Sequence, residues 1–192
     1  MTDPVKVVSI CGSLRKKSFN AALARIAPTL APPGMSILAA PPLDAIPLYN
    51  HDVQESRGFP GPVSDLAAAI RAADAVLIWS PEYNWSMPGV LKNAIDWVSR
   101  MKDQAFAMKP VAIQSAATGL LGGSRMQYHL RQSLTSIDAV LFGRPEVIVT
   151  FAGQKFDDKL GLKDQPTIDL IKQQLASFEK HIRMVKSHKA AG

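Results

Sequence analysis

The segment SPEYNWSMPGVLKNAIDW, residues 80–97, decides which fold the chain adopts. The run before it, Ala75–Trp79, is short, apolar and rich in β-branched and aromatic residues, which predicts a buried strand. Pro81 ends that strand, and from Val90 onward apolar residues recur at helical spacing. A loop rich in aromatic and amide groups therefore lies between the carboxyl end of a strand and the start of a helix, where open α/β sheets bind ligands.

Strand and helix patterns alternate along the rest of the chain. The residues predict five strands, at 5–11, 35–39, 75–79, 111–115 and 146–151. Helices are predicted between and after them, at 21–27 ending before Pro28, from a cap at Ser64, from Val90, from Ser124 and after Pro166. Such alternation predicts a parallel sheet with right-handed crossovers. We therefore expect a single domain, 1–192, with a three-layer, doubly wound α/β fold around a five-stranded parallel sheet.

The segment 41–62 interrupts this alternation. It is rich in proline and polar residues, which predicts a long excursion. Loops of that length in compact domains are often functional or interfacial. We expect this one to take part in self-association.

The composition limits the classes of protein. The chain has 192 residues, of which 47% are hydrophobic and 20% charged, as in an ordinary globular protein. We see no apolar run long enough to span a membrane and no signal peptide, and the single cysteine, Cys11, cannot form an internal disulfide. These features predict a cytoplasmic protein. The net charge of +6 comes without a stripe of basic and aromatic residues, so we expect anionic small ligands rather than nucleic acid.

A second loop, Gly12–Asn20, also leaves a strand and enters a helix. Backbone N–H groups and the helix dipole can hold a phosphate at such a place, although the Walker and dinucleotide-binding glycine patterns are both missing. Ser13, Ser18 and Asn20 supply hydroxyl and amide donors. Arg15 can grip two phosphate oxygens at once. The alternative interpretation is an ordinary helix capped by Ser18 or Asn20.

Three motifs together resemble a known family. They are GSLRKKSFN at 12–20, PEYNWSMPGVLKNAIDW at 81–97 and GGSRMQYHLR at 122–131. With them the chain resembles the NADPH-dependent FMN reductase family, and within it the bacterial soluble quinone and chromate reductases. The resemblance spans about 5–149, and the length of the second motif makes it specific.

The resemblance implies a flavodoxin-like fold that binds FMN non-covalently, with NADPH or NADH as co-substrate. In such proteins the first loop holds the FMN phosphate, the loop after Ser80 lies along the isoalloxazine ring, and the loop after Ser115 contacts the ring or the ribityl chain from the other side. The implied cofactor-binding residues are Gly12, Ser13, Arg15, Ser18, Phe19, Asn20, Pro81, Glu82, Tyr83, Asn84, Ser115, Ala117 and Thr118.

No catalytic side chain is expected, because a flavin carries the redox chemistry itself. The histidines show no spacing typical of metal ligands, so we expect no metal site. Glu82 is expected to brace its loop or a neighbouring subunit, and Tyr83 and Trp85 either shape the flavin slot or pack between helices.

A further group at the expected subunit boundary consists of Arg125, Tyr128 and Glu146. These side chains can pair across subunits, or they can form a plain surface network within one chain. Enclosure of the flavin between two chains is typical of the resembled family. We therefore expect a homodimer or a dimer of dimers, that is, a homotetramer.

These features predict an FMN-dependent NAD(P)H oxidoreductase. It would pass hydride from NAD(P)H through bound FMN to a small-molecule electron acceptor, such as a quinone, flavin, azo dye or chromate, in ping-pong order. Two alternatives stay open. One is a flavodoxin-type electron carrier, although such carriers are usually acidic and the pI here is about 9.6. The other is a nucleotide-binding regulator without flavin.

Overall fold

The computed structural model describes the backbone of residues 3–191. Its strands are β1 Val5–Cys11, β2 Met35–Ala39, β3 Ala75–Trp79, β4 Pro110–Ala116, β5 Val140–Leu141 and β6 Val147–Val149. All pairings are parallel, in the order β2-β1-β3-β4-β5, with β6 also paired to β4. This is the flavodoxin-like order, in which the winding reverses between β1 and β3. The predicted doubly wound parallel sheet is therefore confirmed.

The fifth position of the sheet is shared by two short strands. β5 pairs with the start of β4, at Pro110 and Val111, whereas β6 pairs with its end, from Gln114 to Ala116. The residues between β5 and β6 include Pro145, which has no N–H to donate to a ladder. The single strand predicted at 146–151 is thus shorter than expected, and the separate short strand β5 was not predicted.

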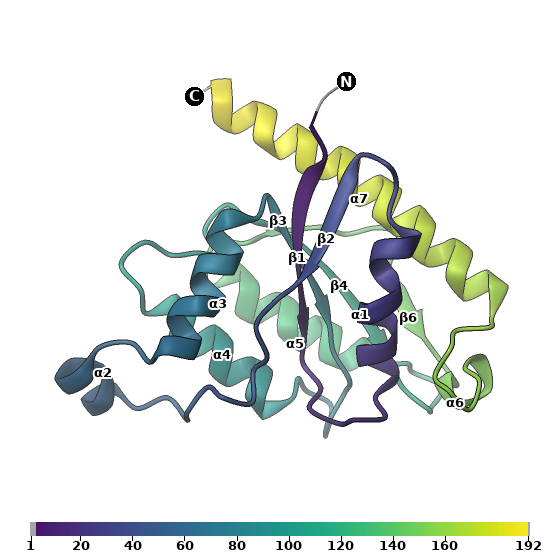
Figure 1. The fold of residues 1–192 in the computed structure, drawn as a ribbon, viewed down its shortest axis with the longest axis horizontal. Coiled ribbons are helices and arrows are strands. Elements are labelled where there is room, and N and C mark those ends of the chain that lie inside the picture. The colour runs from purple at the N-terminus through teal and green to yellow at the C-terminus, as the bar shows by residue number, and fades with distance from the viewer. Residues whose placement is uncertain (1–2, 192) are drawn as a thin grey trace.

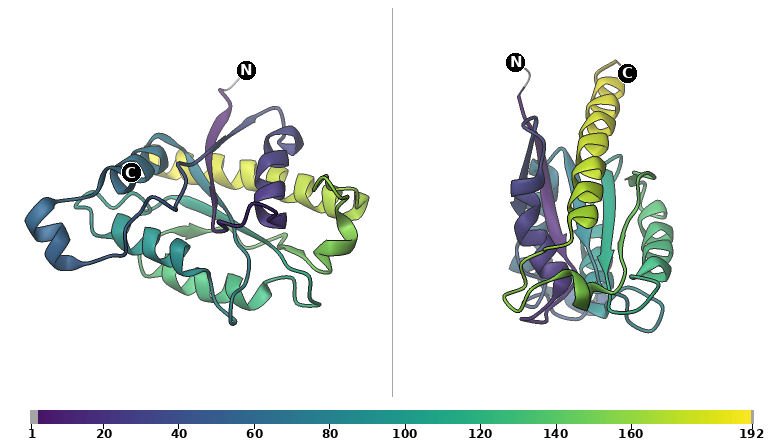
Figure 2. Two further views of the ribbon diagram at one scale, coloured as in Figure 1. Left: turned by 60° about the horizontal axis from the view of Figure 1, so that its bottom comes forward. Right: turned by 90° about the vertical axis from the view of Figure 1, so that its right-hand side faces the viewer.

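Helices cover both faces of the sheet, which gives three layers (Figures 1 and 2). They are α1 Phe19–Leu30, α2 His51–Arg57, α3 Gly61–Ala72, α4 Gly89–Ser99, α5 Ser124–Thr135, α6 Ala152–Lys155 and α7 Gln165–Ala191. On one face α3, α4 and α5 share an apolar cluster with Val76 and Ile78, and on the other α1 and α7 pack on Ala75 and Leu77. Every residue of β3 is buried as a result, which explains its unbroken apolar sequence.

The structure corrects the predicted boundaries of two helices. α1 begins at Phe19 rather than Ala21, and it does not stop before Pro28 but continues to Leu30, with the proline in its last turn. There the missing N–H removes only one intrahelical hydrogen bond, and the fully buried Ala27 keeps the turn packed. Ser64 is not the cap of α3, which begins at Gly61 after Pro60. Prolines are favoured at a helix start because their fixed φ suits the first turn.

The excursion at 41–62 contains the short helix α2, which projects to one side in Figure 1. Its entry is fastened to α4. The carbonyl of Pro47 accepts hydrogen bonds from Trp97 Nε1 at 2.8 Å and from Asn93 Nδ2 at 2.9 Å. The amide N–H of Tyr49 donates to Asn93 Oδ1 at 2.8 Å. This part of the chain is therefore held by side chains of the 80–97 segment.

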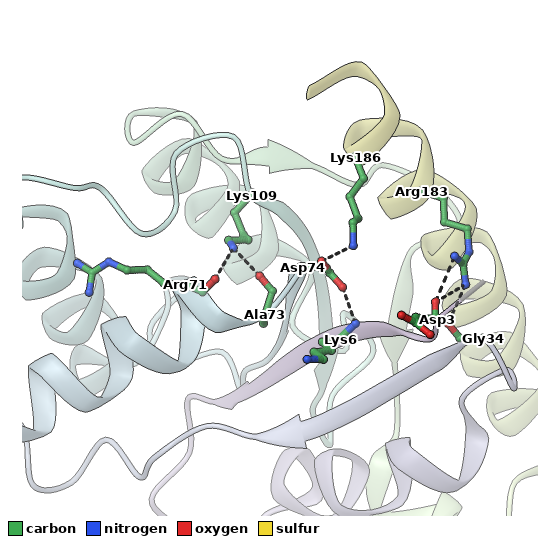
Figure 3. A network of polar contacts seen from close by, with 9 residues as sticks. All are labelled: Asp3, Lys6, Gly34, Arg71, Ala73, Asp74, Lys109, Arg183 and Lys186. Atoms are coloured by element: carbon green, nitrogen blue, oxygen red, sulfur yellow. Dashed lines mark hydrogen bonds and ion pairs between the residues drawn. The ribbon is translucent and has the colours of Figure 1, made fainter. Parts of the chain in front are cut away.

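Charged side chains join α7 to the amino ends of the central strands (Figure 3). Asp74, just before β3, accepts the backbone N–H of Lys6 at 2.8 Å through Oδ2 and pairs through Oδ1 with Lys186 Nζ at 2.6 Å. Arg183 donates to the carbonyl of Gly34 at 3.1 Å. These contacts lie at the edge of the sheet opposite the carboxyl ends of the strands.

The Asp74 contacts predict a specific loss of stability in acid. Burial alone would raise the pKa of Asp74, but hydrogen bonds from Lys186 and Lys6, with the charges of Lys186 and Lys109, lower it. A carboxylate with a lowered pKa stabilises the fold above its ordinary pKa of about 4, and this contribution is lost as the pH falls through the folded value. We expect Asp74→Asn to cost about 1 kcal/mol at pH 7 and much less at pH 3.

Urea denaturation at both pH values measures this difference. Asp103→Asn is the matched control, because Asp103 pairs with Arg71 at 2.8 Å but is mostly exposed. We expect the control to cost less than Asp74→Asn at pH 7. A cost for Asp74→Asn that is the same at pH 7 and pH 3 would contradict the assigned role of its charge.

Candidate functional site

The loops that follow β1, β3 and β4 enclose a pocket of about 160 Å³ at the carboxyl edge of the sheet. They lie together along the lower edge of Figure 1. The pocket is lined by Ser13, Arg15, Ser18, Phe19, Asn20, Pro81, Glu82, Tyr83, Ala116, Ala117 and Thr118. It lies where the winding of the sheet reverses, the usual ligand position in this topology. Most of the residues predicted from the sequence therefore meet at one place.

Gly12, Asn84 and Ser115 are the predicted residues that do not line this pocket. A Cβ on Gly12 would lie 3.1 Å from both Leu91 Cδ2 and Ser80 Oγ, so the glycine permits β1 to pack closely at its end. Ser115 is buried, and its Oγ accepts a hydrogen bond from Gln127 Nε2 at 2.8 Å. These residues support the walls of the pocket, and Asn84 lies at the tip of a turn beside it.

The first loop enters α1 at Ser18. The Ser18 Oγ caps the helix by accepting the N–H of Ala21 at 3.2 Å. The cap that the sequence offered as the alternative interpretation is therefore present, and Ser18 also lines the pocket. Asn20 is not the cap, because its amide is bonded to Ala116. The N–H groups of the first turn carry the positive end of the helix dipole, and the Arg15 guanidinium adds a full charge nearby.

The second loop forms a tight hairpin turn. Tyr83 and Ser86 exchange two backbone hydrogen bonds, of 2.9 and 3.0 Å, around Asn84 and Trp85, whose φ angles are +49° and +67°. A positive φ is rare for a side chain as large as that of Trp85. Its indole ring lies against the Arg125 guanidinium, 4.1 Å from the ring centroid, which helps to hold it.

Both aromatic side chains of this turn are exposed. Tyr83 is 51% exposed and Trp85 63% exposed. Packing between helices, one of the two interpretations from the sequence, is therefore not their role in this chain. Tyr83 lines the pocket, and Trp85 lies two residues farther along the same turn.

Glu82 joins the second loop to α5. Its Oε2 accepts the backbone N–H of Met126 at 3.1 Å, in the first turn of the helix. α5 begins after Gly123, which has φ of +95° and no side chain to cap the helix. A Cβ at this glycine would lie 2.8 Å from Ser115 Cβ, which explains why it is glycine. Glu82 thus braces its own loop, one of the two roles expected for it.

On either side of the third loop, the end of β4 and the start of α5 contain residues that the sequence analysis missed. Ala116 lines the pocket although only its neighbours were predicted. Gln127, on the inward face of α5, is 1% exposed and donates to Ser115 Oγ at 2.8 Å and to the Val147 carbonyl at 2.9 Å. The position of Gln127 next to the inward-facing Met126 could have marked it in the sequence, because a buried amide needs hydrogen-bond partners.

Cys11 ends β1 behind the first loop. Burial raises the pKa of its thiol, and the smaller opposing effects of the Ser13 backbone and the Arg25 charge do not cancel that rise. The thiol donates weakly to the Ser13 carbonyl, with Sγ 3.7 Å from the oxygen. A raised pKa disfavours the reactive thiolate, which agrees with a packing role.

Within one chain, Arg125, Tyr128 and Glu146 do not form a single network. Arg125 lies against Trp85, Glu146 pairs with Arg131 at 3.4 Å, and the side chain of Tyr128 is exposed. Among residues 3–191, no three His, Cys, Asp or Glu side chains come close enough to hold a metal ion. None of the helices in that range combines the length and hydropathy needed to cross a bilayer.

Comparisons with known proteins identify relatives over nearly the whole chain. The family model described as NADPH-dependent FMN reductase matches residues 5–154. A quinone reductase of Escherichia coli K12 is 48% identical over 187 residues, which cover 97% of this chain and all of that protein. An NAD(P)H-dependent FMN reductase of Pseudomonas aeruginosa is 47% identical over 186 residues, with the same coverage.

A solved structure shows the same relationship. The flavoenzyme NAD(P)H:(acceptor) oxidoreductase FerB from Paracoccus denitrificans superimposes with a TM-score of 0.84 at 29% identity, covering 94% of this chain and 98% of FerB. The matched family region includes all three loops of the pocket. The fold, the pocket and these similarities lead to one conclusion: this chain belongs to the NADPH-dependent FMN reductase family.

Proposed function

We propose that the protein is an FMN-dependent NAD(P)H oxidoreductase that reduces quinones or similar small acceptors. The observation that carries the proposal is the pocket itself, which the three loops form at the reversal point of the sheet. The relatives named quinone reductase and NAD(P)H-dependent FMN reductase, each aligned over its whole length, support the same activity. We also propose that residues 1–192 form one FMN-binding domain, because both apolar clusters share one sheet.

The residues of the pocket fit FMN by their chemistry. Ser13, Arg15 and Ser18 offer hydroxyl and guanidinium donors beside the start of α1, as a dianionic phosphate needs. Tyr83 and Thr118 lie in loops on two other sides of the pocket, where a planar ring and its polar edge can be contacted. When bound, FMN supplies the redox chemistry, accepting hydride from NAD(P)H and passing electrons to the acceptor.

In this proposal the residues of the chain bind and orient the cofactor. The Tyr83–Ser86 turn is fixed by its two backbone hydrogen bonds, and Glu82 ties it to α5. Such fixed walls reduce the entropy cost of ordering a ligand. We assign no acid–base step to Glu82, because its carboxylate already accepts the N–H of Met126.

An absorbance spectrum tests the cofactor and the first half-reaction together. The protein purified with FMN is expected to show the two visible bands of oxidised flavin, which bleach when NADPH is added under nitrogen. Recovery of the bands on addition of benzoquinone would complete the cycle. A protein that stays colourless after incubation with FMN would overturn the proposal.

Steady-state kinetics separate the enzyme from an electron carrier. Double-reciprocal plots of the rate against NADPH concentration, at several fixed concentrations of benzoquinone, are expected to give parallel lines, as in ping-pong order. A flavodoxin-type carrier would bind FMN but show no sustained turnover of the pair. The pI of about 9.6 favours the enzyme, since carriers of that type are usually acidic.

We further propose self-association as a dimer or dimer of dimers. Large apolar side chains are exposed in the loops after β3 and β4 and on α5, namely Tyr83, Trp85, Leu120, Leu121 and Tyr128. Exposed apolar surface is typical of protein interfaces. Arg125, Tyr128 and Glu146 remain the predicted contacts, and light scattering after gel filtration tests the assembly. A monomer with full activity would contradict it.

Location in the cytoplasm and independence from nucleic acid remain proposals as well. The single cysteine and the ordinary globular composition support the first, and the scattered basic residues support the second.

A further inference from the structure

At the pocket, β4 continues where β3 has already ended. The Ser80 N–H donates to the Gln114 carbonyl at 3.1 Å, and Pro81 then leads the chain into the second loop. Backbone groups alternate in direction along a strand, so Ala116 faces the same side as Gln114. The N–H and C=O of Ala116 therefore face the place that β3 has left, where buried backbone groups need new partners.

Asn20 supplies both partners. The Ala116 N–H donates to Asn20 Oδ1 at 2.9 Å, and Asn20 Nδ2 donates to the Ala116 carbonyl at 2.9 Å. Asn20 is only 2% exposed. A primary amide carries the donor and acceptor of a peptide group, so this side chain makes the contacts that a neighbouring strand would make.

This pair of hydrogen bonds joins two walls of the pocket. Asn20 lies in the first turn of α1, next to the cap Ser18, and Ala116 leads directly into Ala117 and Thr118. The amide oxygen and one of the two amide hydrogens of Asn20 are thereby used within the protein. A single amide hydrogen remains for a ligand.

We propose that Asn20 is a positioning residue, which holds the 116–118 loop against α1 so that the whole flavin fits, rather than a ligand of the FMN phosphate. The proposal rests on the proposed function, because it takes flavin as the occupant. It differs from the expectation drawn from the family resemblance, which grouped Asn20 with the phosphate-binding residues.

Binding of FMN and of riboflavin, which lacks the phosphate, distinguishes the two roles. Asn20→Ala leaves both backbone groups of Ala116 without these partners. It is expected to lower the affinities for FMN and for riboflavin by about tenfold or more and to leave the ratio of the two affinities unchanged. Quenching of flavin fluorescence by the apoprotein measures each affinity. A loss confined to FMN would overturn the proposal.

Asn93→Ala is the matched control. Asn93 makes the same kind of two-point contact, with the Tyr49 N–H at 2.8 Å and the Pro47 carbonyl at 2.9 Å, outside the pocket. We expect it to lower the melting temperature about as much as Asn20→Ala while leaving both flavin affinities unchanged. Equal loss of flavin binding in the two variants would assign the Asn20 effect to general destabilisation and refute the proposal.

Amide hydrogen exchange in the flavin-free protein gives a readout independent of the ligand. Asn20→Ala is expected to speed exchange at Ala116 while β1 and β3 exchange as in the wild type. If the alanine variant does not fold, Asn20→Asp takes its place in the test. This variant keeps the acceptor for the Ala116 N–H and loses the donor to the Ala116 carbonyl, so slow exchange at Ala116 should persist. Unchanged exchange at Ala116 in Asn20→Ala would contradict the positioning role. Failure of the wild type to bind either flavin would instead refute the proposed function and leave the exchange result standing.

Discussion

Arg15→Ala is expected to lower the affinity for FMN by roughly a hundredfold and to leave the affinity for riboflavin nearly unchanged. Among the residues that line the pocket, Arg15 alone carries a permanent positive charge. Its guanidinium can donate two parallel hydrogen bonds to a phosphate, and hydrogen bonds between charged groups are worth about 1.5–3 kcal/mol each. Riboflavin has no phosphate, so the same substitution removes nothing that riboflavin uses.

Lys17→Ala is the control for this prediction. Lys17 belongs to the same loop, carries the same charge and is exposed like Arg15, but it does not line the pocket. Its loss should lower the affinity for FMN only slightly, and raised salt should abolish this effect because exposed charges are screened. An equal loss for Lys17→Ala and Arg15→Ala would show that the loop acts through its general field rather than by direct contact. An equal loss of FMN and riboflavin affinity in Arg15→Ala would show that Arg15 shapes the pocket instead of binding the phosphate.

The central strands and the ligand edge were predictable because their signals are local. The unbroken apolar run of β3 followed by Pro81 indicates a strand buried on both faces that ends at a loop. The helical spacing after Val90 indicates α4. Parallel strands place their carboxyl ends together, so loops at 12–20, 80–89 and 116–123 had to meet once the sheet was inferred.

The features that were missed depend on contacts between distant parts of the chain. Pro28 was expected to end α1, but packing of α1 against the sheet outweighs the loss of one hydrogen bond. The Asn20–Ala116 pair joins residues that are 96 positions apart, and no local pattern marks it. Likewise the stacking of Arg125 on Trp85 follows from a turn whose φ angles are unusual for its residues. Secondary-structure propensity reflects residues that are close in sequence, whereas these contacts form only when distant parts of the chain pack around the sheet.

The largest loss of stability is expected from Trp97→Ala. Trp97 is fully buried under the excursion, with its ring 4.9 Å from that of Tyr49 in an edge-to-face arrangement and 6.2 Å from that of Phe59. Truncating a buried tryptophan costs about 3–5 kcal/mol, because the transfer free energy is lost and a cavity remains. The excursion should also lose its anchor, so trypsin or another protease is expected to cut within 41–62 faster than in the wild type.

Two further tryptophan substitutions separate the contribution of ring burial to the stability loss of Trp97→Ala from that of the indole hydrogen bond. Trp97→Phe removes the indole N–H but keeps most of the ring, and the Pro47 carbonyl still accepts the hydrogen bond from Asn93, so its cost should be well below that of alanine. Trp85→Ala removes a side chain that is 63% exposed and should change the free energy of unfolding by less than about 1 kcal/mol. Urea titrations of the three variants measure the order. If Trp85→Ala proved as costly as Trp97→Ala, burial would not explain the cost of losing Trp97. Unchanged proteolysis within 41–62 in Trp97→Ala would contradict the anchoring of the excursion by α4.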